Sequence, residues 1–210
     1  MFQRRKVAIK VLLVKKQHLV ENNLNTPAKE SLKREAENLL LLNAAQHPNF
    51  PVLLADNTKT LPYHLITVFE KSRDLLQFLQ RSRGTNPPLQ PVQLIKMLLD
   101  VTDALLFLEE KGLVHRAVMA ANVLVGDSYI CKLSGMQHLR QLASQNFVNS
   151  VNEEELPLRW KAPEVLSECR FSTASDVWAL GVLMYEVLTC GCLPYRLISD
   201  SEELCSRVSN

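Results

Sequence analysis

Residues 113–125 read LVHRAVMAANVLV, and this stretch decides how the whole chain is interpreted. His115, Arg116 and Asn122 are polar, and short apolar runs lie on either side of the segment that holds them. On its own, HRAVMAAN would pass for the end of a helix. Three interpretations are therefore open at this point: an active site, a site that has lost its activity, or a chance run of residues.

The composition is that of an ordinary soluble globular protein. The chain has 210 residues, of which 47% are apolar and 22% charged, and its formal net charge is +2. No basic run forms a patch for nucleic acid, and no apolar stretch is long enough to cross a membrane. The cysteines lack the spacing of a zinc site, which predicts free structural thiols in a reducing compartment. They are Cys131, Cys169, Cys190, Cys192 and Cys205.

The pattern of apolar residues predicts a small mixed part followed by a mainly helical part. In the first half we expect a strand, a helix that starts at Thr26-Pro27, and two further strands. The three strands cover residues 7–14, 50–54 and 61–69. In the second half we expect helices over residues 74–81, 92–111 and 176–188, two short strands around Gly126-Asp127, and a loop over 137–156. The last helix is apolar nearly all round, which predicts burial at the centre of a lobe.

Eight motifs occur in the order found in the protein kinase family, which the chain resembles along nearly its whole length. They are VAIK (7–10), Glu35 in KREAENLL, HPNF (47–50), LITVFEKSRDLLQFL (65–79), HRAVMAAN (115–122), ICKLSGMQ (130–137), LRWKAPE (158–164) and SDVWALGVLMYEVLT (175–189). The form RW-x-APE resembles tyrosine kinases, and MAANVLVGDSYICK resembles Src-like and receptor tyrosine kinases. The membrane-linked STYK/NOK type is a further resemblance.

The resemblance implies an α+β, two-lobed kinase-like fold, with a partial N-lobe and hinge over residues 1–70 and a partial C-lobe over 71–210. The N-lobe is small and strand-rich and has no Gly-rich loop, so the strand that carries Lys10 is expected to present an unpaired edge. The C-lobe is mainly helical and is expected to be truncated after its central helix. The chain is therefore open to interpretation as an incomplete piece of a longer protein.

The resemblance also implies a nucleotide site. Lys10 takes the position of the lysine that holds the phosphates, and Glu35 that of its partner. The adenine base would lie between Ala8 and Leu124, with Thr67 at the gatekeeper position and Phe69 in the hinge. We expect weak ATP binding at these residues.

The same alignment of motifs shows what has been lost. Ala117 stands where the family has the aspartate that accepts the substrate proton, a role that typically contributes about 100-fold to 10,000-fold in rate. Gly135 stands where an aspartate binds magnesium, so Asn122 is the one remaining side-chain ligand and magnesium binding is doubtful. Met119 and Ala121 occupy the positions at which tyrosine kinases carry an arginine. His115, Arg116 and Asn122 keep their places without the base, so no catalytic set is intact.

The sequence therefore favours a tyrosine-kinase-like pseudokinase that acts as a scaffold or allosteric regulator of protein partners, such as active kinases or other signalling proteins. One alternative is a weak or atypical ATP-dependent tyrosine kinase, and a second is a fragment of a longer receptor-like or membrane-linked kinase. The expected location is cytoplasmic, with membrane association through upstream sequence as the alternative. His115 and Asp176 are expected to support the loop internally. Glu153–Glu155 either form a solvated run or pair with Arg116 in place of a phosphate.

Overall fold

The computed structural model describes residues 6–13, 26–72, 74–142 and 156–209. Its α-helices are α2 (Pro27–Asn43), α3 (Leu75–Ser82), α4 (Pro91–Glu110), α5 (Pro163–Glu168), α6 (Thr173–Leu188) and α7 (Ser201–Ser209). Its strands are β1 (Val7–Val11), β2 (Leu53–Asn57), β3 (His64–Val68), β4 (Leu113–Val114), β5 (Val123–Val125), β6 (Cys131–Leu133) and β7 (Arg140–Gln141). Short 3-10 turns are η1 (Ala120–Asn122), η2 (Asp127–Tyr129), η3 (Met136–His138) and η6 (Leu158–Trp160).

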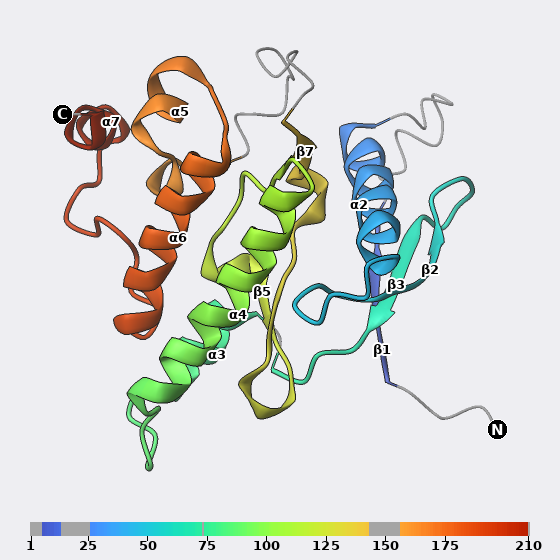
Figure 1. The fold of residues 1–210 in the computed structure, drawn as a ribbon, viewed down its shortest axis with the longest axis horizontal. Helices are drawn as coiled ribbons and strands as arrows, with labels where there is room; N and C mark the ends of the chain where they lie inside the picture. Colours follow the sequence, from blue (N-terminus) through green and yellow to red (C-terminus); the bar gives the residue numbers. More distant parts are fainter. Residues whose placement is uncertain (1–5, 14–25, 73, 143–155, 210) are drawn as a thin grey trace.

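The molecule has two lobes, as the sequence predicts. The sheet β1-β3-β2 and helix α2 form the small lobe, and the helices from α3 onward form the larger one (Figure 1). Helix α2 begins as expected, because Thr26 accepts the Lys29 N–H at 3.2 Å and Pro27 takes the first helical position. Its buried residues recur at helical spacing and face the sheet and η3: Leu32, Ala36, Leu39 and Leu42.

Strand β1 lies at an edge of the antiparallel sheet. It pairs with β3 from Val7 opposite Val68 to Val11 opposite His64, and no other described strand pairs with it. The prediction of an unpaired edge on the strand of Lys10 is thus confirmed for the residues that the structure describes. Exposed apolar side chains on β1 include Ile9, which keeps 58% of its surface in water.

The predicted starts of the next two strands are each three residues too early, and proline explains both shifts. Strand β2 also ends at Asn57, beyond its predicted end at residue 54. Phe50 is buried in the core instead of starting a strand, and β2 begins only after Pro51. Strand β3 begins at His64, after Pro62. Proline has no backbone N–H to give to a ladder, so a strand tends to start beyond it.

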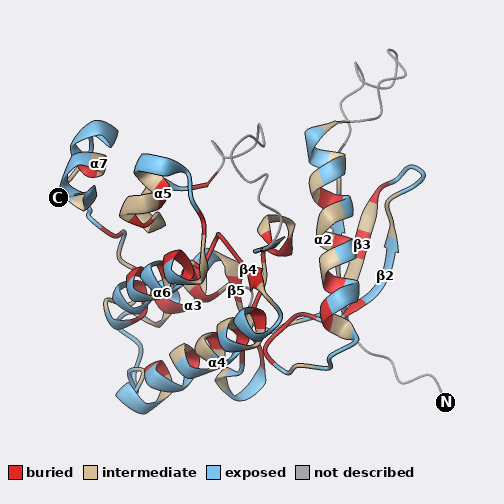
Figure 2. Ribbon diagram, turned by 45° about the horizontal axis from the view of Figure 1, so that its top comes forward, coloured by how far each residue is buried: buried red, intermediate tan, exposed pale blue. Residues whose placement is uncertain are grey.

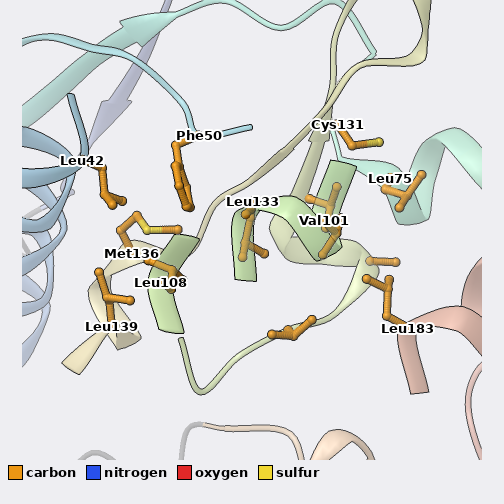
Figure 3. Close-up of a cluster of buried hydrophobic side chains, with 14 of the residues drawn as sticks. Leu42, Phe50, Leu75, Val101, Leu108, Cys131, Leu133, Met136, Leu139 and Leu183 are labelled. Carbon is orange, nitrogen blue, oxygen red and sulfur yellow. The ribbon is translucent and has the colours of Figure 1, made fainter. Parts of the chain in front are cut away.

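The larger lobe is built around α4, whose inward residues follow the predicted helical period. Leu94, Met97, Val101, Ala104 and Leu108 are buried along one side of it. They join a single apolar cluster that includes Met136 of η3 and extends into the small lobe through Leu42 and Phe50 (Figure 3). Full burial of a side chain of this size contributes about 1.5–3 kcal/mol. The shared cluster therefore ties the two lobes together.

Helix α6 corrects one prediction, because it is not buried all round. Leu183 and Val187 are buried, but Val177 keeps 64% and Leu188 keeps 59% of their surface exposed. The pale outer side of α6 is visible in Figure 2. The part of this side that includes Val177 lines an open groove of about 880 Å³, together with residues 194–198 and Arg207. The helix predicted from the apolar residues of α6 is present, but other described residues pack against only one side of it.

The segment predicted as a loop over residues 137–156 is also corrected in part. Its described residues include the end of η3 and the short strand β7, which pairs with β4 through Val114 and Arg140. Residues 143–155 lie outside the described ranges. Helix α7 was not predicted, because only Leu204 of its nine residues is buried and its apolar period is short. None of the described helices has the length and apolar character needed to span a membrane.

Candidate active site

The loop that starts at His115 is held by a carboxylate from α6. The two oxygens of Asp176 accept the backbone N–H groups of His115 at 2.7 Å and Arg116 at 2.8 Å. Arg116 adopts φ +74°, a left-handed conformation that a non-glycine residue keeps only when its surroundings fix it. Burial raises the pKa of Asp176 to about 6, against the opposing effect of these two hydrogen bonds. Asp176 thus shapes the loop, as the resemblance implies.

His115 is part of the loop's internal support. Its ring is fully buried, with Nε2 2.8 Å from the carbonyl oxygen of Ser134 and Nδ1 3.2 Å from the backbone nitrogen of Ala117. Because the carbonyl needs a donor and the N–H needs an acceptor, the neutral Nε2–H form satisfies both contacts. Burial is the main cause that lowers the pKa of His115 to about 4, which keeps the ring neutral near pH 7.

Ala117, Asn122 and Gly135 meet at the centre of the site. The Asn122 amide donates to the carbonyl of Ala117 at 2.9 Å, so the asparagine braces the loop. Gly135 has φ +86°, and a Cβ atom placed on it would lie 3.0 Å from Cγ of Asn122. Neither Ala117 nor Gly135 brings a carboxylate to this point. The structure therefore places the three residues together, but as a backbone frame without an acid.

These residues do not fit a magnesium ion. Magnesium prefers oxygen ligands in near-octahedral geometry. Asn122 supplies one amide oxygen, and within the described ranges no group of three or more His, Cys, Asp or Glu side chains is arranged to hold a metal ion. Asp127, the nearest downstream acid, is exposed on η2 and pairs with Lys71 at 3.7 Å.

Lys10 of β1 and Glu35 of α2 form an ion pair at 2.5 Å. The lysine side chain is 57% exposed, so the pair adds little to stability. Helix α2 fixes the position of Glu35. Asn38, one turn further along this helix, donates to the Met136 carbonyl at 2.6 Å. Met136 is fully buried in the cluster that joins the lobes. The pair therefore sits on a helix that is fixed to the start of η3.

The other predicted nucleotide residues lie in both lobes. Ala8 and Thr67 are direct cross-strand partners in β1 and β3. Phe69 follows β3, is 41% exposed, and its N–H donates to the Lys6 carbonyl at 3.3 Å. Leu124 lies on β5 in the larger lobe, where its backbone bridges to Asp74 at the start of α3. The structure thus brings Ala8 and Thr67 side by side in the small lobe. It places Phe69 directly after β3 and Leu124 on β5 of the larger lobe.

Positive charge gathers where η3 leads into β7. The pKa of His138 is lowered to about 4, first by burial and then by Arg116, Arg140, Lys10 and Arg34. The Arg116 guanidinium carbon lies 4.1 Å from the centre of the Phe171 ring. The alternative in which Glu153–Glu155 pair with Arg116 concerns residues outside the described ranges, so it stays a prediction.

Two residues of the frame were missed by the sequence interpretation. Glu186 is buried in α6, where one oxygen accepts the Ala120 N–H at 3.0 Å and the Trp160 indole N–H at 2.8 Å. Burial raises its pKa. A charged residue inside an apolar helix was the available signal, because such residues are seldom buried without partners. Asn38 carried no comparable signal, since an asparagine on a helix is usually solvent-exposed.

Comparison with known proteins agrees with this geometry. The model of the family described as protein tyrosine and serine/threonine kinase matches residues 2–210. The chain is 34% identical to the tyrosine-protein kinases Btk and Abl of Drosophila melanogaster over 169 and 181 residues, and 33% identical to human Fer over 162 residues. These matches cover 79%, 83% and 77% of the chain, but only 21%, 11% and 19% of the relatives. The chain is a tyrosine-kinase-like member of the protein kinase family.

Proposed function

We propose that this chain is a pseudokinase domain that works through contacts with protein partners and transfers little or no phosphate. The observation that carries the proposal is the centre of the site, where Ala117 and Gly135 meet around Asn122 and none of the three residues supplies a carboxylate. A kinase mainly positions its reactants and stabilises charge, and the two missing acids remove the proton acceptor and the metal ligand together.

The frame that supports the loop also favours a structural role. Asp176 holds two backbone N–H groups, Glu186 accepts from η1 and η6, and His115 links the loop to Ser134. Every one of these contacts preserves shape, and none presents a base to a substrate. An assembled lobe pair of this kind regulates a partner when the partner binds one of its conformations better than another.

The residues present fit part of a nucleotide. Lys10, held by Glu35, would meet phosphate oxygens, and the neighbouring Ala8 and Thr67 would contact the base. ATP bound there would supply phosphate only if a base and a metal site were provided, and neither fits these residues. We therefore expect weak nucleotide binding that does not depend on magnesium.

A weak tyrosine kinase is the second candidate, favoured by the intact Lys10–Glu35 pair and by tyrosine kinase relatives. Thermal melting of the purified chain with ATP, in the presence and absence of magnesium, separates the two. Ligand binding to the folded state raises the midpoint, with about 2.7 kcal/mol of stabilisation at 100 times the dissociation constant. A shift without magnesium that Lys10→Met abolishes supports the pseudokinase.

Phosphate transfer completes the test. We expect no transfer from labelled ATP to a tyrosine peptide above the level seen with Lys10→Met. Transfer by the wild-type chain that Lys10→Met removes would overturn the proposal. The double variant Ala117→Asp, Gly135→Asp returns both missing acids to the frame and serves as the gain-of-function control. Because the new side chain at residue 135 lies against Asn122, thermal melting first checks that this variant is folded.

A further inference from the structure

A cysteine pair lies on a tight turn far in sequence from the candidate active site. Cys190, Gly191 and Cys192 follow the end of α6, and both Cys190 (φ +52°) and Gly191 (φ +79°) are left-handed. The Gly191 N–H donates to the Glu186 carbonyl at 2.6 Å. This sequence of left-handed residues folds the chain back on itself at the helix end.

Helix α3 packs closely against this turn. A Cβ atom on Gly191 would lie 3.1 Å from Cγ of Gln80 and 3.2 Å from a methyl carbon of Leu76. Only glycine combines the positive φ with this approach. The two cysteines are therefore held in place by α6 on one side and α3 on the other.

The two thiols are close enough in sequence to react with each other. Residues separated by a single neighbour have Cα atoms at most about 7 Å apart, and left-handed backbone shortens this span. A disulfide needs Cα atoms closer than about 7 Å. Both cysteines are partly exposed, so a small oxidant can reach them.

Arg83 at the end of α3 contacts both residues. Its Nε donates to the Cys190 carbonyl at 2.8 Å, and its Nη2 lies 3.6 Å from Sγ of Cys192. The first contact fixes the guanidinium, and the second brings positive charge to one of the two sulfurs. A guanidinium N–H beside a sulfur can also hydrogen-bond a peroxide oxygen that approaches this sulfur, so the contact distinguishes Cys192 from Cys190.

We propose that Cys190 and Cys192 form a redox pair that hydrogen peroxide converts into an intramolecular disulfide, with Cys192 attacked first. The Cys192 thiolate takes an oxygen from peroxide, which breaks the O–O bond and, with one proton, releases water and leaves a sulfenic acid. The Cys190 thiol then displaces that oxygen as a second water and forms the S–S bond. Two thiols and one peroxide thus give one disulfide and two waters. The proposal does not depend on nucleotide binding or phosphate transfer.

The other cysteines provide internal controls. Cys131 is buried, and burial raises the pKa of its thiol to about 12, which makes it unreactive. Cys169 is more exposed than either member of the pair, whereas the sulfur that Arg83 contacts is that of Cys192. Exposure alone therefore predicts that Cys169 reacts first, whereas the geometry around Arg83 predicts Cys192.

The experiment uses the reduced 210-residue chain, limiting hydrogen peroxide and mass spectrometry of tryptic peptides. Cys190 and Cys192 share the peptide 171–196, while Cys131, Cys169 and Cys205 each fall in a different peptide. We expect peptide 171–196 to lose two hydrogen atoms several-fold faster than any other cysteine is oxidised, and a reducing agent to reverse the change. Faster oxidation of Cys169 or Cys205, or disulfides between molecules, would overturn the proposal.

Three variants then test the order of events. In Cys190→Ser the sulfenic acid at Cys192 has no thiol to meet, so a 1,3-diketone reagent should trap it there. Cys192→Ser should leave Cys190 reduced at the same dose of peroxide. Arg83→Gln should slow disulfide formation several-fold, whereas Arg81→Gln, two residues earlier and within α3, should not. Thermal melting of each variant in the reduced state shows that a slower reaction does not come from unfolding.

Discussion

The indole N–H of Trp160 donates to the buried carboxylate of Glu186 at 2.8 Å, and this bond ties η6 to the last turn of α6. The same carboxylate oxygen accepts the N–H of Ala120 in η1. One side chain thus connects three segments that are far apart in sequence, and the shape of the candidate site depends on it.

Glu186→Ala should therefore be among the costly single changes in this chain. It leaves the Trp160 and Ala120 donors buried without an acceptor, which we expect to lower the free energy of unfolding by about 2–4 kcal/mol. Urea denaturation measures the loss. Glu110→Ala, at the exposed end of α4, is the control and should stay within about 0.5 kcal/mol. An equally small effect of Glu186→Ala would show that the carboxylate is not the link described above.

His115 makes a pH-dependent contribution whose sign follows from its lowered pKa. The folded chain binds the His115 proton only below about pH 4, whereas the unfolded chain binds it below about 6.5. Between these values the unfolded state holds more protons, so this group's contribution to stability rises with pH and is lost as the pH falls toward 4. Compared with His115→Phe, the wild-type chain should gain about 3 kcal/mol between pH 4 and 6.5.

Urea denaturation of both proteins at intervals of pH measures this difference. The lowered pKa of His138 and the raised pKa of Asp176 act in both proteins, so the comparison isolates His115. A difference between wild type and variant that is constant with pH would show that the ring titrates alike in the folded and unfolded chains.

Two glycines should respond in opposite directions to the same substitution. Gly135→Ala puts a side chain on a left-handed residue and against Asn122, which should cost about 1–2 kcal/mol. Gly181 lies inside α6 with nothing within 4 Å of a new Cβ atom, so Gly181→Ala should stabilise the chain by about 0.5–1 kcal/mol. Thermal melting compares the two. A neutral effect of Gly135→Ala would show that residue 135 does not need the left-handed backbone and the close approach to Asn122 described above.

Arg159 is expected to control access of proteases to the segment before α7. Its guanidinium donates to the carbonyls of Pro194, Tyr195 and Ile198 at 2.6–2.9 Å. Arg159→Gln cannot reach all three, so chymotrypsin should cleave after Leu197, which is 91% exposed, faster than in the wild type. Arg170→Gln, which removes only an exposed ion pair with Glu168, is the matched control. Equal rates in all three proteins would contradict this role of Arg159.

Much of the fold could be predicted because its signals are local. The Thr26-Pro27 start of α2 and the period of α4 depend on residues near one another in sequence. The strand limits at Pro51 and Pro62 were missed because the apolar pattern was followed across residues that cannot donate to a ladder. The exposed side of α6 could not be predicted, because the apolar pattern shows which residues favour burial but does not show which segments pack against them.

The candidate site divides in the same way. The losses at Ala117 and Gly135 are visible in the sequence because each is a change of residue type inside a motif. The brace from Asn122 to Ala117 and the close approach at Gly135 depend on how β5 and β6 meet, so only the structure shows them. Glu186 works across three segments, and no spacing along the chain reveals its partners.

The open side of α6 has a consequence for the heat capacity of unfolding. Newly wetted apolar surface raises this quantity by about 0.45 cal/K/mol for each Å². Val177, Leu188 and Leu197 are already largely in water in the folded chain, so unfolding adds little from them. Calorimetry should therefore give a heat capacity change of unfolding below the usual value of about 12–15 cal/mol/K per residue. A molecule that covers this groove would bury its apolar surface and would therefore bind with a negative change in heat capacity, which calorimetry can detect.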